Sequence, residues 1–195
     1  IVKLNAPVIS DTLVNNKFVW TASQVGITGY EVRVVGETTT YVTISDVNVK
    51  EFELGDAFGA GDYAVSVRAL GDGISYIKSD FSNVKNVTKL NEANAIIEKQ
   101  NNNSTSDYII RWNAIENATG YNVLVNDGVV YTTETFISID NLNDIKIGQN
   151  SAKIVALGND NSFVNSNKSN EVLFDVTSGD DISMRIASGK LVWAG

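Results

Sequence analysis

The residues that could carry out chemistry in this chain are few, because it contains neither histidine nor cysteine. Without an imidazole or a thiolate, the sequence offers no Ser-His arrangement, no disulfide and no cysteine-bound zinc. Ser75 and Lys78 have the spacing of a serine nucleophile and its lysine base, but that motif opens a helix, and here it precedes a strand pattern. We therefore expect no catalytic residue and no enzyme in these 195 residues.

Gly59, Gly61 and Ala64 have the spacing of a dinucleotide-binding loop. Such a loop needs a strand before it and a helix after it, so that backbone N–H groups point at the pyrophosphate. Here the alternating segment YAVSVRA follows, which is typical of a strand. The sequence predicts a turn at this place and no bound cofactor.

Loop carboxylates at Asp56 and Asp62, and at Asp160, could be ligands for calcium. No Asp-x-Asp-x-Asp-Gly loop accompanies them, so the pattern favours solvated turn residues. We predict no metal site.

The net charge excludes two classes of partner. Fifteen basic and 23 acidic residues give −8, and lysine and arginine form no cluster, so phosphate backbones and anionic lipid surfaces would be repelled. No segment approaches the roughly 18 unbroken apolar residues that a membrane span needs. We expect neither nucleic-acid binding nor membrane insertion.

Three aromatic residues lie off the presumed core, namely Tyr76, Phe81 and Phe163. Rings in such places can stack on a sugar or anchor a partner, so they form a possible interaction surface for a protein or a glycan. Scattered exposed aromatic residues also occur on proteins without any partner.

The elements that position these residues are repeated along the chain. Trp20 and Trp112 each lead, ten or nine residues later, into Gly-Tyr and an alternating apolar segment, and residues 61–73 align with 148–160 at an offset of 87. Such internal similarity indicates repeated structural units. We predict two domains, 1–89 and 90–178, followed by a truncated start of a third repeat at 179–195, so that the chain is expected to be a fragment of a longer protein.

Alternation along each repeat predicts strands with one apolar face. About seven short strands per unit, bounded by Gly, Asn and Asp, indicate an all-β fold built from two sandwiches. The predicted core residues are Phe18, Trp20, Tyr30 and Tyr63 in the first unit and Ile110, Trp112 and Tyr121 in the second.

Four features follow one another along the sequence: a strand that starts with proline, apolar-x-Trp, Gly-Tyr-x-Val-x-Val, and Gly-Asp-Tyr-x-Val-x-Val-x-Ala. This order resembles a fibronectin type III domain, in tandem, over nearly the whole chain. The resemblance implies immunoglobulin-like β-sandwiches in which Trp20 and Tyr30 are core residues. It also implies that the Tyr63 hydroxyl closes a corner at the start of its strand. Asn150 stands at the Tyr63 position of the second unit, which departs from the family pattern.

Modules of this kind are common in bacterial surface proteins and in the linkers of secreted polysaccharide-degrading enzymes. We therefore predict a non-catalytic structural or interaction module of a bacterial cell-surface or secreted protein, which acts outside the cell in spacing, presentation or adhesion. The alternative is an accessory carbohydrate-binding or spacer region of a secreted glycoside hydrolase. Fold alone does not decide between them.

The segment 179–195 carries Lys190-Leu191-Val192-Trp193, which repeats Lys17-Phe18-Val19-Trp20. A lone pair of strands is marginal in water. Two arrangements would order it: the segment adds as a strand to an exposed sheet edge, of its own or of a neighbouring molecule, or another segment or chain supplies the rest of a third sandwich. We favour the first as the hypothesis, which implies self-association through strands.

Overall fold

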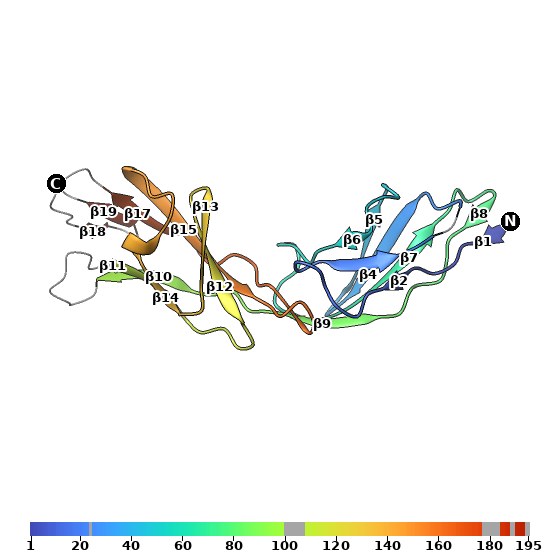
Figure 1. The fold of residues 1–195 in the computed structure, drawn as a ribbon, viewed down its shortest axis with the longest axis horizontal. Coiled ribbons are helices and arrows are strands. Elements are labelled where there is room, and N and C mark those ends of the chain that lie inside the picture. Colours follow the sequence, from blue (N-terminus) through green and yellow to red (C-terminus); the bar gives the residue numbers. More distant parts are fainter. Residues whose placement is uncertain (24, 100–107, 177–183, 188–189, 194–195) are drawn as a thin grey trace. The chain divides into compact units, whose positions relative to one another are not determined.

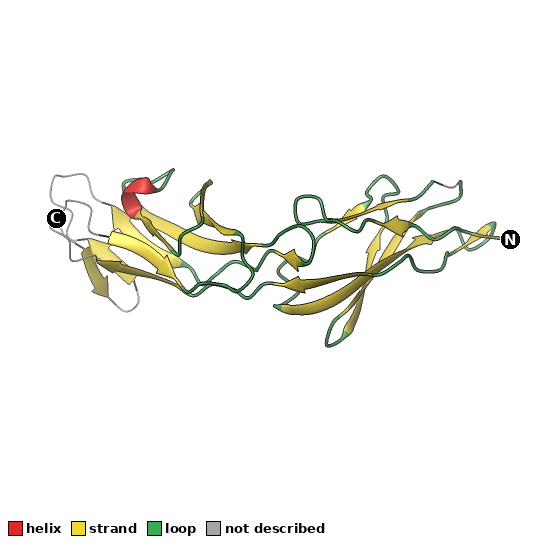
Figure 2. Cartoon of the chain, turned by 60° about the horizontal axis from the view of Figure 1, so that its bottom comes forward, coloured by secondary structure: helices red, strands yellow, loops and turns green. Residues whose placement is uncertain are grey.

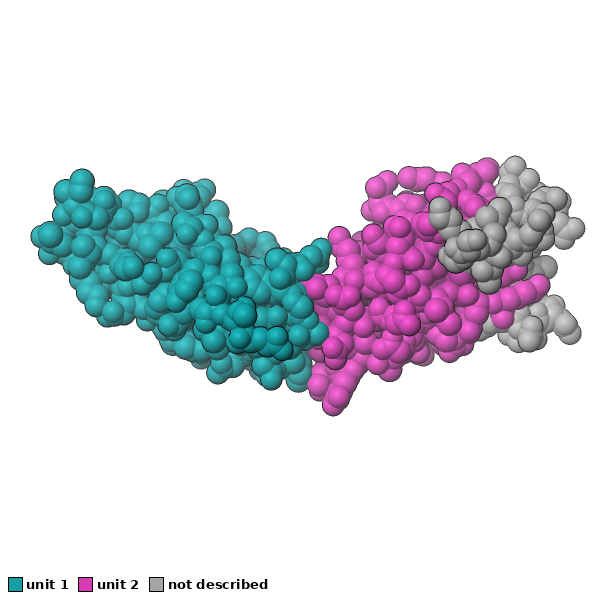
Figure 3. Space-filling model, turned by 180° about the vertical axis from the view of Figure 1, so that it is seen from behind, with its two compact units in different colours: residues 1–89, 158–164 teal, residues 90–157, 165–195 magenta. Residues whose placement is uncertain are grey.

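The computed structural model describes residues 1–23, 25–99, 108–176, 184–187 and 190–193. These residues form strands joined by loops, with one short 3-10 helix, η1 (Ile139–Asn141), among them (Figure 2). The predicted all-β class is confirmed. The chain divides into two compact units (Figure 3): unit 1 is Ile1–Lys89 with Gly158–Val164, and unit 2 is Leu90–Leu157 with Asn165–Gly195.

Unit 1 is a sandwich of two sheets (Figure 1). The smaller sheet has the order β2-β3-β6, with β2 (Val8–Ile9), β3 (Phe18–Thr21) and β6 (Glu51–Phe52). The larger has the order β16-β9-β7-β4-β5, with β16 (Phe163–Val164), β9 (Lys85–Lys89), β7 (Gly61–Leu70), β4 (Gly29–Val35) and β5 (Thr39–Ile44). A separate parallel pair joins β1 (Val2–Lys3) to β8 (Tyr76–Ile77).

The core of unit 1 lies between these sheets, because alternate residues of each strand point inward. Phe18 and Trp20 of β3 face Tyr30 and Val32 of β4, and all four side chains are buried. The rings of Trp20 and Tyr30 meet edge to face with centroids 5.4 Å apart, a favoured aromatic geometry. Tyr63 packs against the same cluster and its hydroxyl donates to the Gly59 carbonyl at 2.9 Å.

Unit 2 has the same two-sheet plan. One sheet has the order β10-β11-β14, with β10 (Ala95–Lys99), β11 (Tyr108–Trp112) and β14 (Phe136–Ser138). The other has the order β13-β12-β15-β17, with β13 (Gly128–Thr132), β12 (Gly120–Val125), β15 (Gly148–Leu157) and β17 (Val172–Val176). Ile110, Trp112 and Tyr121 are buried, and the rings of Trp112 and Tyr121 repeat the edge-to-face contact at 5.4 Å.

The start of the expected third repeat forms a hairpin, in which β18 (Met184–Ala187) pairs antiparallel with β19 (Lys190–Trp193). The predicted self-association through 179–195 depends on side chains that lie outside the described part of the structure.

Candidate functional site

One loop of the second sequence repeat belongs to the first compact unit. This junction loop, Gly158–Val164, leaves unit 2 after β15 and returns to it before β17. The chain therefore passes between the units three times, at 89/90, 157/158 and 164/165. The division by contacts differs at these residues from the predicted domains 1–89 and 90–178, which remain a prediction.

The junction loop is shaped by its own sequence. The Asn159 side-chain oxygen accepts backbone N–H groups of Asn161, Ser162 and Phe163 at 3.0, 2.9 and 3.0 Å. Asparagine is favoured in turns because its side chain can bond the backbone in this way. A Cβ on Gly158 would lie 2.1 Å from the Phe163 carbonyl oxygen, so only glycine fits where the loop closes.

Asp160 carries the contacts from the loop tip to the turn between β2 and β3. Its backbone carbonyl accepts the Leu13 N–H at 2.8 Å, and its carboxylate accepts the Asn16 N–H at 2.7 Å. The Asp160 backbone has φ of 54°, a left-handed conformation that aspartate tolerates better than most residues. The Asn16 side-chain amide in turn donates to Glu53 at 2.8 Å. The loop thus supplies acceptors to a turn that lies some 145 residues earlier in the sequence.

The end of the junction loop extends the larger sheet of unit 1. Phe163 and Val164 pair in parallel with Thr88 and Lys89, and the Thr88 N–H donates to the Ser162 carbonyl at 2.8 Å. Val164 is 0% exposed and belongs to the core of unit 1. Strand addition and apolar burial therefore hold this end of the loop.

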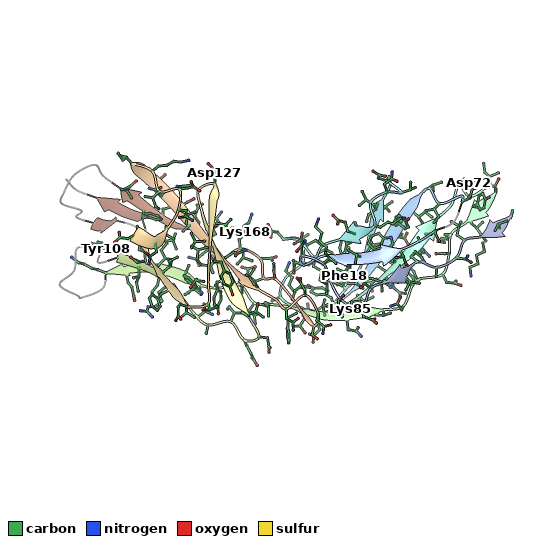
Figure 4. The ribbon with its side chains drawn as sticks, in the orientation of Figure 1. Phe18, Asp72, Lys85, Tyr108, Asp127 and Lys168 are labelled. Carbon is green, nitrogen blue, oxygen red and sulfur yellow. The ribbon has the colours of Figure 1, made fainter. Side chains whose placement is uncertain are left out.

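Two lysines of β9 support the same region. Lys89 is 2% exposed, and its ammonium group donates to the carbonyls of Leu54 and Gly55 at 2.5 and 2.9 Å, which offsets part of the cost of burying it. Lys85 donates to the Asp11 carbonyl and to the Asn161 side chain. Lys85 and Asp72 lie at opposite ends of unit 1 (Figure 4).

The three residues of the predicted interaction surface are not brought together. Phe163 lies in β16, and Tyr76 lies in β8, where its ring packs on the core of unit 1 and against Gly26. Phe81 lies on the outer face of the larger sheet, with the guanidinium carbons of Arg33 and Arg68 at 4.2 and 4.6 Å from its ring centre.

This outer face holds a small aromatic and charged cluster. The Tyr41 ring lies 6.4 Å from Phe81, Arg33 donates to Ser66 at 3.1 Å, and Arg68 forms an ion pair with Glu31. We call Glu31, Arg33, Tyr41, Arg68 and Phe81 the outer-face cluster. Tyr41 is its most exposed ring, at 56%.

Two cavities of about 520 and 570 Å³ in unit 1 share Asp62 and Tyr63 in their walls. The Asp62 carboxylate accepts the Thr88 hydroxyl at 2.5 Å. Gly61 opens strand β7, so strand and not helix follows the glycines of the dinucleotide-like spacing, and Ser75 and Lys78 flank strand β8. Among the described residues no group of three His, Cys, Asp or Glu side chains could hold a metal ion, and no helix is long and apolar enough to cross a membrane.

The junction loop was missed in the sequence although a signal for it exists. GDGISYI at 71–77 and GNDNSFV at 158–164 share glycine, Asp or Asn, serine, an aromatic and an apolar residue at an offset of 87. The Asn150 network of unit 2 was missed as well: this residue is 1% exposed and makes side-chain hydrogen bonds to Lys146, Gly148 and Asn126.

No known family model matches the sequence, and no curated protein matches it either. Among solved structures, the chain is similar to the FN1–FN3 domains of chicken CNTN1, at 14% identity and a TM-score of 0.35. The match covers 87% of this chain and 65% of that one, so the chain spans less than two thirds of its length.

Proposed function

We propose that the chain is a non-catalytic spacer or presentation module built from tandem sandwiches of the fibronectin type III kind. The junction loop is the observation that carries this proposal. Two units joined by a single linker can rotate about a few backbone torsions. Here three backbone connections join the units, and the seven residues Gly158–Val164 of the second repeat belong to unit 1. We propose that these connections restrict the movement of the units, which a spacer needs because its task is to keep a set distance.

The place of action is part of the same proposal. The repeated Gly-Tyr-x-Val-x-Val and Gly-Asp-Tyr-x-Val-x-Val-x-Ala patterns support an extracellular module of a bacterial cell-surface or secreted protein, in spacing, presentation or adhesion.

A distance measurement tests the spacer function. The chain has no cysteine, so Thr43→Cys and Lys168→Cys, both at exposed positions, give one spin label in each unit. We expect a narrow distribution of label distances that broadens with Asp160→Gly, which removes the carboxylate without straining the backbone. Asp160→Asn keeps an acceptor oxygen and should leave the distribution narrow. A distribution equally broad in all three proteins would refute the spacer function.

The outer-face cluster favours a second candidate, the binding of a protein or glycan partner, including the role of accessory carbohydrate-binding region. An exposed ring beside a guanidinium can stack on a sugar or on a partner side chain. Screening on a glycan array should then show binding that Tyr41→Ala abolishes. Tyr131→Ala is the matched control, since Tyr131 is an exposed tyrosine of unit 2. Equal binding by both variants would contradict a role for the cluster.

A further inference from the structure

The N-terminal end of unit 1 contains a second loop with the conformation of the junction loop. In residues 71–77 the Asp72 carboxylate accepts the N–H groups of Ile74, Ser75 and Tyr76, each at 2.8 Å, as Asn159 does 87 positions later. A Cβ on Gly71 would lie 2.3 Å from the Tyr76 carbonyl oxygen, the same restriction that Gly158 meets. The two loops are one motif.

Strand β1 stands beside this loop as the end of β9 stands beside the junction loop (Figure 1). Val2 and Lys3 pair in parallel with Tyr76 and Ile77, which matches the pairing of Thr88 and Lys89 with Phe163 and Val164. The Val2 N–H donates to the Ser75 carbonyl at 2.8 Å, and the Thr88 N–H donates to the Ser162 carbonyl at 2.8 Å. Lys3-Leu4-Asn5 also repeats Lys89-Leu90-Asn91 in sequence, and both leucines are buried.

The two arrangements differ in burial. Val164 is fully buried in the core of unit 1, whereas its equivalent Ile77 is 41% exposed. Lys89 is buried on two carbonyls, whereas the side chain of its equivalent, Lys3, is 52% exposed and pairs with Asp80 at 2.6 Å. At the loop tip the two arrangements agree, since Ile74 and its equivalent Asn161 are both exposed. The N-terminal end of unit 1 therefore repeats the backbone pairing of the junction loop, but its Ile77 and Lys3 are exposed where Val164 and Lys89 are buried.

We propose that this end of unit 1 is a docking face for another β-sandwich unit of the same repeat type. Ile77 would be buried in the core of that unit, as Val164 is buried in unit 1. Lys3 would donate to the carbonyls that follow the strand equivalent to β6, as Lys89 donates to Leu54 and Gly55. The turn equivalent to the β2–β3 turn would donate to the Gly73 carbonyl alone, because Gly73 stands where Asp160 also supplies a carboxylate. The face would thus carry one acceptor fewer than the junction loop.

The docking face rests on the proposed spacer function and extends it to a further unit. Its experiment measures the thermal stability of Ile77 variants, whereas the spacer experiment measures distances between spin labels. Either proposal can therefore fail while the other holds. Residues 1–87 are fused ahead of Val2 in the full chain, which places Val2 and Lys3 at the positions of Thr88 and Lys89 in the added unit. Ile77→Asp is then introduced into the second copy of the loop in the fused chain, and at the same residue in the present chain.

We expect Ile77→Asp to lower the thermal unfolding midpoint of the added unit by roughly 4 to 8 °C or more, and that of the present chain by less than about 2 °C. Ile74→Asn, which introduces the residue found at Asn161, is the matched control and should shift neither. Equal shifts in the two chains would overturn the proposal. Amide exchange gives a second measurement: an added unit that stays unfolded while the other two remain protected also overturns it, because the face then failed to complete a sandwich.

Discussion

At the scale of single residues, the two repeats use different side chains to hold the turn before the same strand. In unit 1 the Tyr63 hydroxyl donates to Gly59, and this bond lies at the surface. In unit 2 the Asn150 side chain is buried, donates to the carbonyls of Lys146 and Gly148 and accepts from Lys146 and Asn126. The Asn150 amide of unit 2 thus makes four hydrogen bonds, whereas the Tyr63 hydroxyl at the equivalent position of unit 1 makes one.

Asn150→Ala should therefore destabilise unit 2 more than Tyr63→Phe destabilises unit 1. The alanine variant leaves the Lys146 N–H and the carbonyls of Lys146 and Gly148 without this partner, at a cost of about 2 to 4 kcal/mol, whereas removal of one exposed hydroxyl costs about 0.5 to 1.5 kcal/mol. Chemical denaturation of both variants measures the difference in the free energy of unfolding. An Asn150→Ala effect no larger than the Tyr63→Phe effect would show that the network contributes little.

Asp72 makes the loop at 71–77 sensitive to acid. Hydrogen bonds from the backbone N–H groups of Tyr76, Ile74 and Ser75 lower the pKa of this carboxyl below its ordinary value near 3.8. Because the pKa is lower in the folded chain, the stabilisation is present above the ordinary pKa and is lost as the pH falls through the folded value. Asp72→Asn, which matches Asn159 of the other loop, should remove that loss. Amide exchange at Ser75 and Tyr76 below pH 4 checks this, and equal acid sensitivity in wild type and variant would contradict it.

At the scale of strands and sheets, alternation decides much of the structure. Glu31 and Arg33 alternate with Tyr30 and Val32 along β4, and because one face of the sheet is buried, this pattern specifies both the strand and its orientation. The junction loop could not be predicted in this way, since Phe163 and Val164 are too few to show a period. These two residues join unit 1 because Thr88 and Lys89 pair with them and because Val164 packs on the core of unit 1, and both partners are far away in sequence. The outer-face cluster likewise depends on Phe81, which follows β8 and lies in no strand.

The contacts between the sheets depend on Trp20 and Trp112, which are 4% and 3% exposed. Each indole contacts the tyrosine of the opposite sheet, Tyr30 or Tyr121, so truncation opens a cavity in the middle of its sandwich. Either substitution to alanine should cost about 3 to 5 kcal/mol in the unit that carries it. Denaturation followed by near-ultraviolet circular dichroism measures this, and a cost below about 1 kcal/mol would argue against a central role for the indole.

Val164→Ala should destabilise unit 1, although the residue belongs to the second sequence repeat. Removal of two buried methyl groups costs on the order of 2 kcal/mol. Amide exchange can locate the effect: Val65 and Val67 of β7 should exchange faster, while Val123 of β12 should be unaffected. Faster exchange confined to unit 2 would contradict the placement of the junction loop.

At the scale of the whole molecule, repetition predicts more than composition does. The offset of 87 indicates two similar sandwiches, because each repeat carries its own Trp, Gly-Tyr and alternating strands. It does not show which unit takes up a loop, since the two loops have the same pattern although Val164 is buried and its equivalent Ile77 is 41% exposed. Val164 is buried through its contacts with the core of unit 1, which lies far from it in sequence.

Because the junction loop contributes Val164 to the core of unit 1, unit 1 cannot complete its folding until that loop has been synthesised. The first 89 residues contain most of unit 1, yet its core lacks Val164 until the 75 residues from Leu90 to Val164 have been added. At about 5 to 20 residues per second, the ribosome needs roughly 4 to 15 s for that stretch. Throughout this interval the outer edge of β9 is unpaired, and the turn at Leu13 to Asn16 lacks the two acceptors that Asp160 supplies. Unit 1 is therefore completed only shortly before unit 2.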